Sequence, residues 1–320
     1  MSIDKTIFIF LFALLTLMVK EDAAIYVFSI ALWIFIARQK RWTGFAIAVI
    51  AVVYFFIANA VVAWLGEGVM MWRLGTYIPG GQGGFIDVIK TVFFNFGFLV
   101  SQVFTHDGDK KIIFILWVFG PLLFTPFLTG KKSELVLLIP MLVINVMLDW
   151  SYQYNIDYQY TFGSVALAFV IALFSIVRMN LQIQRTVMLT CLSVALLFTI
   201  SLNIGKIQRN HNYFFNNIER FRAASTVLEA IEPEASVTTS TFIAPHLYKH
   251  TVVYDSHYFH IYTPQSDGQL IDGLYPLTDY LVIDPNARNA EEIIETYKKA
   301  GYTLEATGGF IEVYKKTLDI

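Results

Sequence analysis

The stretch TIFIFLFALLTLMVKEDAAIYVFSIALWIFIA, residues 6–37, decides the fold. Three consecutive charged residues, Lys20, Glu21 and Asp22, separate two apolar runs that contain no charge. Long apolar runs that recur along a chain are typical of helices that span a bilayer. The chain is 56% hydrophobic and 15% charged, whereas soluble domains carry about 25% charge. The mean hydropathy is +0.56. We therefore predict an α-helical polytopic membrane bundle.

The apolar runs predict about seven spanning helices. We expect them at residues 3–19, 23–37, 43–65, 111–128, 134–149, 161–178 and 186–204. The segment 85–104 is also mostly apolar, but Asp87, Lys90 and Asn95 fall near one face. This pattern favours an interfacial helix that lies on the outer surface and does not span.

Basic loops orient the predicted bundle, because Lys and Arg concentrate in cytoplasmic loops. The loops ARQKRW (37–42), TGKKSE (129–134) and RMNLQIQR (178–185) supply these charges. With seven spans they all fall on one side, which we assign to the cytoplasm. The charges at 20–22 and the tail after the last span then face outward. We expect a multi-pass protein of the plasma membrane.

The tail, residues 206–320, reads as a separate small α/β domain outside the cytoplasm. It carries 10 Lys+Arg against 15 Asp+Glu, whereas residues 1–205 carry 13 against 10. An acidic domain argues against nucleic-acid binding, which needs a basic face. Cys191 is the single cysteine, so a disulfide within the chain is excluded.

Strands and helices alternate in the tail sequence. The segments ASVTTS, HTVVYD and DYLVIDP are rich in β-branched and aromatic residues and predict strands. The segments NNIERFRAASTVLEAI and AEEIIETYKKAG have helical apolar spacing. The run YTLEATGGFIEVYKK predicts a hairpin that turns at Gly308 and Gly309. These elements together favour a layered sheet with helices packed on it.

Two interpretations stay open for Lys20, Glu21 and Asp22. They form either a charged turn that holds a loop at the interface or part of a binding site. In a site, the ammonium pairs with a lipid phosphate, and a carboxylate accepts a proton or binds a divalent cation. We predict no other cofactor.

The outer segment DWSYQYNIDYQYT, residues 149–161, has two interpretations as well. It is either an aromatic belt at the interface or a polar, aromatic wall for a sugar or a lipid headgroup. The candidate lining residues are Tyr154, Asp157, Gln159 and Tyr160. The tail histidines His246, His250, His257 and His260 lie near no carboxylate that completes a metal motif, so we predict no metal site there.

The order of several motifs resembles a known family. They are V-K-E-D at 19–22, W-R-L-G-T-Y at 72–77, GPLLFTPFL at 120–128, EASVTTSTFIAPHLYKHTVVY at 234–254 and DYLVIDP at 279–285. Over nearly its whole length the chain resembles the prokaryotic membrane family termed domain of unknown function 2079. That family is in turn similar to the GT-C glycosyltransferases, which transfer sugar from a polyprenyl-phosphate donor at the outer face.

The resemblance implies a GT-C-like fold with an outward site lined by Lys20, Glu21 and Asp22. Under this hypothesis each candidate residue has a role. Lys20 and Arg73 would bind the donor phosphate, and Glu21 and Asp22 would be catalytic. Tyr154, Asp157, Gln159 and Tyr160 would line the substrate. Family members normally have spans before the K-E-D segment, and GT-C enzymes carry a catalytic acid in the first outer loop.

That difference leads to several expectations about partners and function. The chain is expected to be a fragment, a reduced member or one part of a split enzyme whose membrane subunit is encoded upstream. Its other expected partners are the lipid bilayer and a polyprenyl-phosphate sugar. The alternative function is a non-catalytic membrane-anchored scaffold or binding module. A transporter is disfavoured, because we find no internal repeat.

Overall fold

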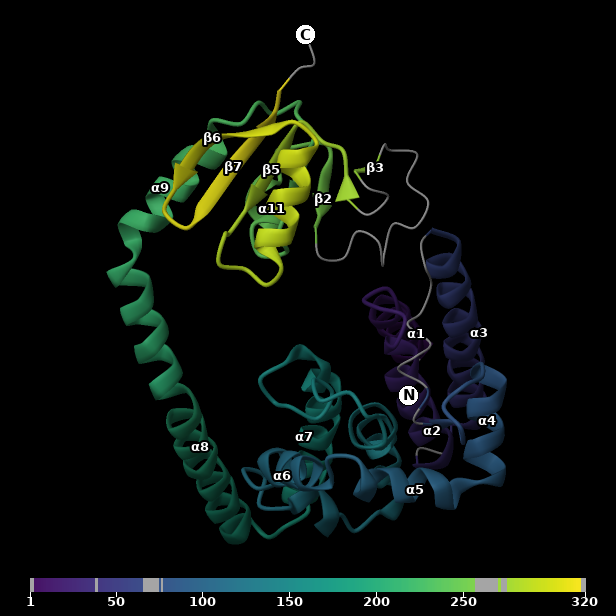
Figure 1. Ribbon diagram of the computed structural model, residues 1–320. Helices are drawn as coiled ribbons and strands as arrows, with labels where there is room; N and C mark the ends of the chain where they lie inside the picture. The colour runs from purple at the N-terminus through teal and green to yellow at the C-terminus, as the bar shows by residue number, and fades with distance from the viewer. Residues whose placement is uncertain are drawn as a thin grey trace. The chain divides into compact units, whose positions relative to one another are not determined.

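The computed structural model describes residues 3–37, 40–65, 75, 77–256, 270–271 and 275–317 (Figure 1). The chain divides into two compact units, Met1–Asn203 and Ile204–Ile320, which we call unit 1 and unit 2. The division falls inside one long helix, α8 (Leu181–Asn216). The two units are described separately below.

Unit 1 is helical throughout its described residues. Before α8 its elements are α1 (Ile3–Leu17), α2 (Ala23–Ala37), α3 (Arg41–Leu65), α4 (Phe85–Phe94), α5 (Phe96–Thr105), α6 (Gly108–Phe119), η2 (Thr125–Leu128), η3 (Lys132–Leu138), η4 (Met141–Val146), η5 (Gln159–Thr161) and α7 (Phe162–Val177).

Several helices are long and apolar enough to cross a membrane. Among the described residues these are α3, the segment Gln159–Val177 and α8, with a fourth if α4 and α5 form one span. No residue of α8 is buried, so its apolar side chains need a non-polar surrounding such as lipid. Helices α1 and α2 have 15 residues each, about 22 Å, which is short of the roughly 30 Å hydrocarbon core. Seven spans are therefore not established.

The segment 85–104 is not the single helix that the sequence predicts. Two helices, α4 and α5, meet there at an angle of 96°. Asn95 causes the bend, because its φ of −140° and ψ of 44° lie outside the helical region. Its N–H closes α4 on the carbonyl of Thr91, and its carbonyl accepts the N–H of Phe98 at the start of α5.

The predicted continuous helices at 111–128 and 134–149 are also wrong. Helix α6 ends at Phe119, and Leu123 and Phe124 take positive φ values before the 3₁₀ turn η2. The second segment is a 3₁₀ helix, η3, followed by a π-helical turn, η4. Pro126 lies in η2 and Pro140 caps η4, and a proline has no N–H for an α-helical bond.

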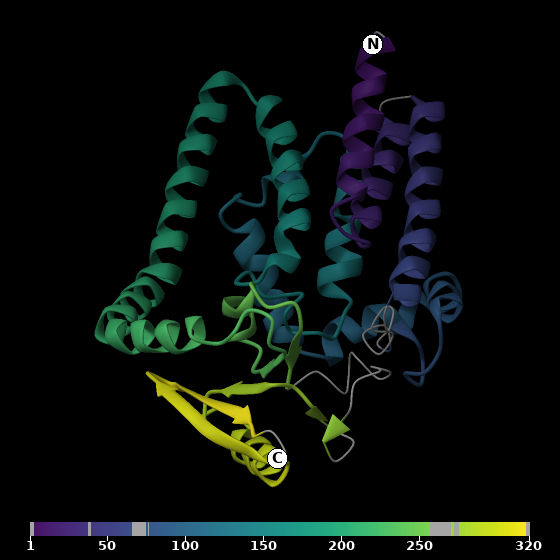
Figure 2. The ribbon, with the colours of Figure 1, turned by 90° about the horizontal axis from the view of Figure 1, so that it is seen from above.

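Close packing of α2 against α3 organises the start of unit 1. A Cβ on Gly44 would lie 2.6 Å from the backbone N of Phe35 and 2.7 Å from the carbonyl O of Ala31. The two backbones therefore touch, as small residues allow in membrane helix pairs. Figure 2 shows these first helices running side by side.

Contacts between helices define two ends of unit 1. Trp33 of α2 stacks on Phe174 of α7 at 5.5 Å, so the chain after α2 and the chain after α7 lie at the same end. Glu134 binds Arg178 there. We call this the basic end. The opposite polar end carries the α1–α2 turn, the start of α6 and the segment 147–161.

Unit 2 is a mixed sheet with helices on both faces. Its elements after α8 are α9 (Ile218–Glu229), β1 (Val237–Thr239), η6 (Ala244–Leu247), β2 (Val253–Asp255), β3 (Leu270–Ile271), β4 (Tyr275–Pro276), β5 (Tyr280–Ile283), α11 (Ala290–Lys299), β6 (Tyr302–Gly308) and β7 (Ile311–Lys316). The five-stranded sheet has the order β2-β1-β5-β7-β6, and β3 pairs with β4 separately. Strands β1, β2 and β5 are parallel, and β7 is antiparallel to both β5 and β6.

Alternate residues of β5 face two separate cores. Tyr280 and Val282 pack with residues of α9 and η6, whereas Leu281 and Ile283 pack with residues of α11. The predicted strands and helices are present, whereas η6, β3 and β4 were not predicted. The β6–β7 hairpin turns at Gly309, which has a φ of +63°. A Cβ on Gly309 would lie 2.0 Å from the carbonyl O of Arg220, so this turn sits directly on α9.

Candidate functional site

The three charges at 20–22 form one ion cluster in the turn between α1 and α2. The Nζ atom of Lys20 lies 2.9 Å from Oδ2 of Asp22 and 3.8 Å from Oε1 of Glu21. Lys20 is 47% exposed, and the two carboxylates are about one-third exposed. A partly exposed cluster of this kind contributes little to stability and stays accessible to a ligand.

Tyr160 from the distant segment 147–161 completes this cluster. The Nζ atom of Lys20 lies 5.6 Å from the centroid of the Tyr160 ring, within reach of a cation–π interaction. The ring of Trp150 packs edge-on against Tyr160 at 4.7 Å, and Tyr152 continues the row at 5.1 Å from Trp150. Four predicted site residues, Lys20, Glu21, Asp22 and Tyr160, therefore meet at the polar end of unit 1.

Asn145 holds Tyr160 in place from the interior. Its side chain is fully buried on the π-helical turn η4. Its amide nitrogen donates to the carbonyl oxygens of Gln153 at 2.6 Å and Tyr160 at 3.1 Å. Its amide oxygen accepts a hydrogen bond from Ser164 at 2.5 Å. The sequence shows Asn145 as a polar residue within an apolar run, but not which groups it binds.

A close contact between α2 and α7 supports the same arrangement. Gly163 lies in the first turn of α7, and a Cβ there would lie 2.5 Å from Cε1 of Tyr26. The Tyr26 ring thus packs directly on the α7 backbone. Because Tyr26 follows the 20–22 turn and Gly163 follows Tyr160, this contact sets the distance between the two halves of the cluster.

Tyr154 belongs to a second polar cluster at the same end. Its hydroxyl donates to Oδ2 of Asp107 at 2.7 Å, and Lys110 binds Oδ1 of Asp107 at 2.9 Å. These contacts, with that of Tyr154 the largest, lower the pKa of Asp107. Burial, followed by the Asp107 hydrogen bond, raises the pKa of Tyr154. The ammonium of the buried Lys111 lies 5.3 Å from the Tyr154 ring centroid.

Three predicted site residues remain, Asp157, Gln159 and Arg73. Asp157 is exposed, and its backbone N–H bonds to the side chain of Asn155 at 3.0 Å. Gln159 is exposed at the start of η5. Arg73 lies outside the described residues.

No group of three metal-ligating side chains occurs within the described residues. His246 lies in the short helix η6, and His250 lies beyond it, with its ring nitrogen 3.3 Å from the carbonyl O of Ala235. His257 and His260 lie outside the described part of the chain. Glu21 and Asp22 offer two carboxylates, which hold Mg²⁺ only when substrate phosphates and waters complete its shell.

A family model described as a predicted membrane protein (DUF2079) matches residues 1–315. The chain belongs to the DUF2079 family. This membership confirms the resemblance seen in the sequence and agrees with the apolar helices of unit 1. No curated protein and no solved structure matches the chain. The GT-C similarity therefore stays a prediction.

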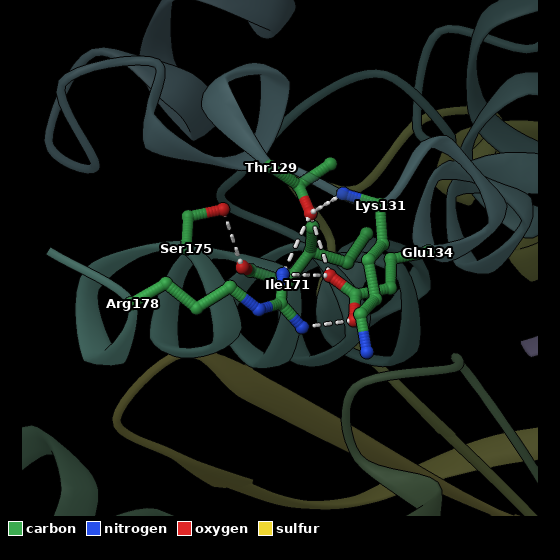
Figure 3. A network of polar contacts seen from close by, with 6 residues as sticks. All are labelled: Thr129, Lys131, Glu134, Ile171, Ser175 and Arg178. Atoms are coloured by element: carbon green, nitrogen blue, oxygen red, sulfur yellow. Dashed lines mark hydrogen bonds and ion pairs between the residues drawn. The ribbon is translucent and has the colours of Figure 1, made fainter. Parts of the chain in front are cut away.

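This DUF2079 protein has a further network that sequence reasoning missed, at the basic end (Figure 3). The guanidinium of Arg178 binds both carboxylate oxygens of Glu134, which is only 4% exposed. Thr129 donates to Glu134 at 2.6 Å and accepts from Arg178 at 3.0 Å. The sequence signal that could have indicated this network is Glu134, the single acidic residue in the basic loop TGKKSE. The network ties the end of α7 to that loop.

Proposed function

We propose that the polar end of unit 1 binds the phosphate of a polyprenyl-phosphate sugar and that the chain takes part in transferring this sugar. The main support is the contact between the Lys20 ammonium and the Tyr160 ring, because these two residues lie far apart in the sequence. An accessible cation beside aromatic rings suits a sugar phosphate, because the ammonium pairs with phosphate and the rings pack against the sugar.

Each residue of the cluster has a defined role in this proposal. Lys20 holds the donor phosphate, with Arg73 as a second cation. Glu21 or Asp22 takes the proton from the acceptor hydroxyl while the hydroxyl oxygen bonds to the sugar C1. The bond from C1 to the phosphate oxygen breaks, and the polyprenyl phosphate leaves with the bonding electron pair. Electrostatic stabilisation of the charge on the leaving phosphate is usually the largest contribution to the rate enhancement at such a site.

The proposal places the polar end and unit 2 outside the plasma membrane, with seven crossings. The gathering of Glu134, Arg178 and the neighbouring basic loops at the opposite end supports it. Labelling tests it in a Cys191→Ser background. Asp157→Cys should react with an impermeant maleimide in intact cells, and Lys131→Cys should not. The reverse labelling would overturn the orientation.

Binding of a short-chain polyprenyl phosphate to the detergent-purified chain tests the function itself. Lys20→Ala should weaken binding at least about tenfold, because a charge-assisted contact contributes roughly 1.5–3 kcal/mol. Lys90→Ala is the matched control, since Lys90 forms an exposed pair with Asp87 at 3.1 Å on α4. Equal binding by both variants would overturn the proposal and favour the scaffold.

The same assay tests the remaining parts of the proposal. Mg²⁺ should tighten phosphate binding in the wild type and not in Glu21→Ala/Asp22→Ala, if the carboxylates share a cation with the phosphate. Purification of the tagged chain from native membranes should recover an upstream-encoded membrane subunit in constant ratio.

A further inference from the structure

Unit 2 contains a hollow of about 1180 Å³ at the carboxyl ends of its parallel strands. Ser240 and Thr241 follow β1, Ser256 follows β2, and Asp284 follows β5, and all four line it. All its lining residues lie between Tyr213 and Ile311, within unit 2. No residue of the cluster around Lys20 is among the described residues that line this hollow.

The topology of the sheet explains the position of this hollow. Neighbouring strands β1 and β5 send the chain to opposite faces. After β1 the chain passes through η6, which packs on the same face of the sheet as α9. After β5 it enters α11, which packs on the opposite face, as Figure 1 shows. Two loops that diverge at neighbouring strands leave a crevice between them. In open α/β sheets, ligands bind at such a switch point.

The charged groups that line the hollow favour an anion. Three basic side chains come from three different elements: Arg220 from α9, His246 from η6 and Arg288 from the loop before α11. Asp284 is the one carboxylate among the lining residues that the structure describes, and it already accepts two hydrogen bonds from Asn286, at 2.9 and 3.2 Å. Among the described residues, the guanidinium of Arg220 makes two long contacts, at 3.3 Å to Asn217 and 3.4 Å to the carbonyl of Gly309.

The uncharged lining favours a ligand that also carries a polar ring. Phe221 packs on Phe310 at 5.4 Å and on Phe214 at 5.7 Å, so aromatic faces form one wall. Hydroxyl and amide side chains also line the hollow: Ser225 from α9, Ser240 and Thr241 after β1, and Asn286 and Asn289 after β5. Aromatic faces with a few polar groups are typical of sites for small organic molecules.

We propose that unit 2 binds a phosphate ester of a polar ring compound at this switch point, with Arg220 and Arg288 on the phosphate. Sugar phosphates and nucleotides share this chemistry. Arginine is suited to the role because its planar guanidinium binds phosphate in a bidentate manner. The site is additional to the proposed transfer site and does not depend on it.

Calorimetry on the detergent-purified full chain tests the proposal with glucose 1-phosphate, AMP, inorganic phosphate and glucose as probes. At least one phosphate ester should bind, and more tightly than glucose. Arg220→Gln and Arg288→Gln should each weaken binding by about tenfold or more, as expected for a charged hydrogen-bonding group. Arg222→Gln is the matched control, because Arg222 lies on the same helix, pairs with Glu219 and does not line the hollow.

The outcomes separate the two ligand sources and the two proposals. Binding of glucose 1-phosphate alone supports a sugar phosphate, and binding of AMP alone supports a nucleotide. Lys20→Ala should bind the ester as the wild type does. The proposal is overturned if neither ester binds, if glucose binds equally well, or if both arginine variants keep full affinity.

Discussion

The ammonium of Lys20 lies 5.6 Å from the ring of Tyr160, although the two residues belong to segments far apart in the chain. Two structural features maintain this distance. Asn145 fixes the carbonyl of Tyr160 from within, and the Tyr26–Gly163 contact joins the two helices beside it. Both features can be changed without touching the charges at 20–22.

Replacing Asn145 with alanine should destabilise unit 1 by roughly 2–4 kcal/mol. The change removes three hydrogen bonds and leaves the carbonyls of Gln153 and Tyr160 without their buried donor. Thermal unfolding in detergent measures the effect. Asn203→Ala is the control, because Asn203 bonds only to the carbonyl of Thr199 on its own exposed helix, and it should cost well under about 1 kcal/mol. Equal losses would contradict the role assigned to Asn145.

Gly163→Ala should disturb the cluster through crowding. The added Cβ would lie 2.5 Å from the Tyr26 ring, so the ring or the helix must move, at a cost of about 1–3 kcal/mol. Binding of polyprenyl phosphate should weaken together with stability. Gly205→Ala, a helical site with no atom within 4 Å of the added Cβ, should instead be neutral or stabilising by up to about 1 kcal/mol. An unchanged melting temperature for Gly163→Ala would refute the contact.

Arg178→Ala should destabilise unit 1 by roughly 2–4 kcal/mol, because it leaves the buried Glu134 carboxylate without its cation. The expected loss is below that of a fully buried pair, since Arg178 is 36% exposed. Arg178→Lys keeps the charge but loses the bidentate geometry, so its loss should be intermediate. The double variant Arg178→Met/Glu134→Leu should recover most stability in thermal unfolding. A double variant as unstable as Arg178→Ala would rule out this explanation.

Glu232 should make the stability of unit 2 depend on acid pH. The hydroxyl of Tyr280 first, then the Glu232 backbone and the Lys315 ammonium, hold the pKa of Glu232 below its ordinary 4.5. Because the folded pKa is the lower one, the stabilisation is present above pH 4.5 and is lost as the pH falls through the folded pKa. Hydrogen exchange of β5 and β7, corrected for intrinsic rates, measures it.

Glu232→Gln should speed that exchange at neutral pH and behave as wild type in strong acid. Glu229→Gln, on the exposed end of α9, is the control and should have little effect at either pH. A Glu232→Gln effect that persists unchanged in acid would show that the carboxylate charge is not its cause.

Gly309→Ala should destabilise unit 2 more than Gly301→Ala does, although both glycines have positive φ. Alanine at Gly301 meets no atom within 4 Å and is penalised only by its backbone, by about 1 kcal/mol. Alanine at Gly309 would also approach the Arg220 carbonyl to 2.0 Å, so the hairpin must separate from α9. Limited proteolysis of the 308–311 turn should detect this separation in Gly309→Ala only. Equal cleavage of both variants would contradict the packing.

The elements of unit 2 were predictable because their signals are local. The β-branched segments around Val237, Val253 and Val282 form the strands they predict, and Gly309 turns the hairpin. The broken segments of unit 1 were not predictable in detail. Pro126 and Pro140 signal interruptions, but the 3₁₀ and π turns depend on packing against α2 and α7, which no short window contains.

The candidate site was predictable only in part. The charges at 20–22 stand out because they interrupt apolar runs. Tyr154 and Tyr160 lie in one irregular segment with no fixed period, so the sequence does not show that Tyr154 binds Asp107 while Tyr160 meets Lys20. The hollow in unit 2 depends on the order of strands in the sheet, which the sequence alone leaves open.

The 2.9 Å contact between Lys20 and Asp22 has a consequence for any phosphate that arrives. The ammonium of Lys20 has three N–H donors. An incoming phosphate would therefore compete with the Asp22 carboxylate for the same donors. If the proposed site binds a phosphate, Lys20 exchanges its contact with Asp22 for one with the phosphate, and Asp22 loses its counter-ion. Under the proposed function, binding of the donor would release the Asp22 carboxylate from Lys20, whereas an empty site leaves the two side chains paired.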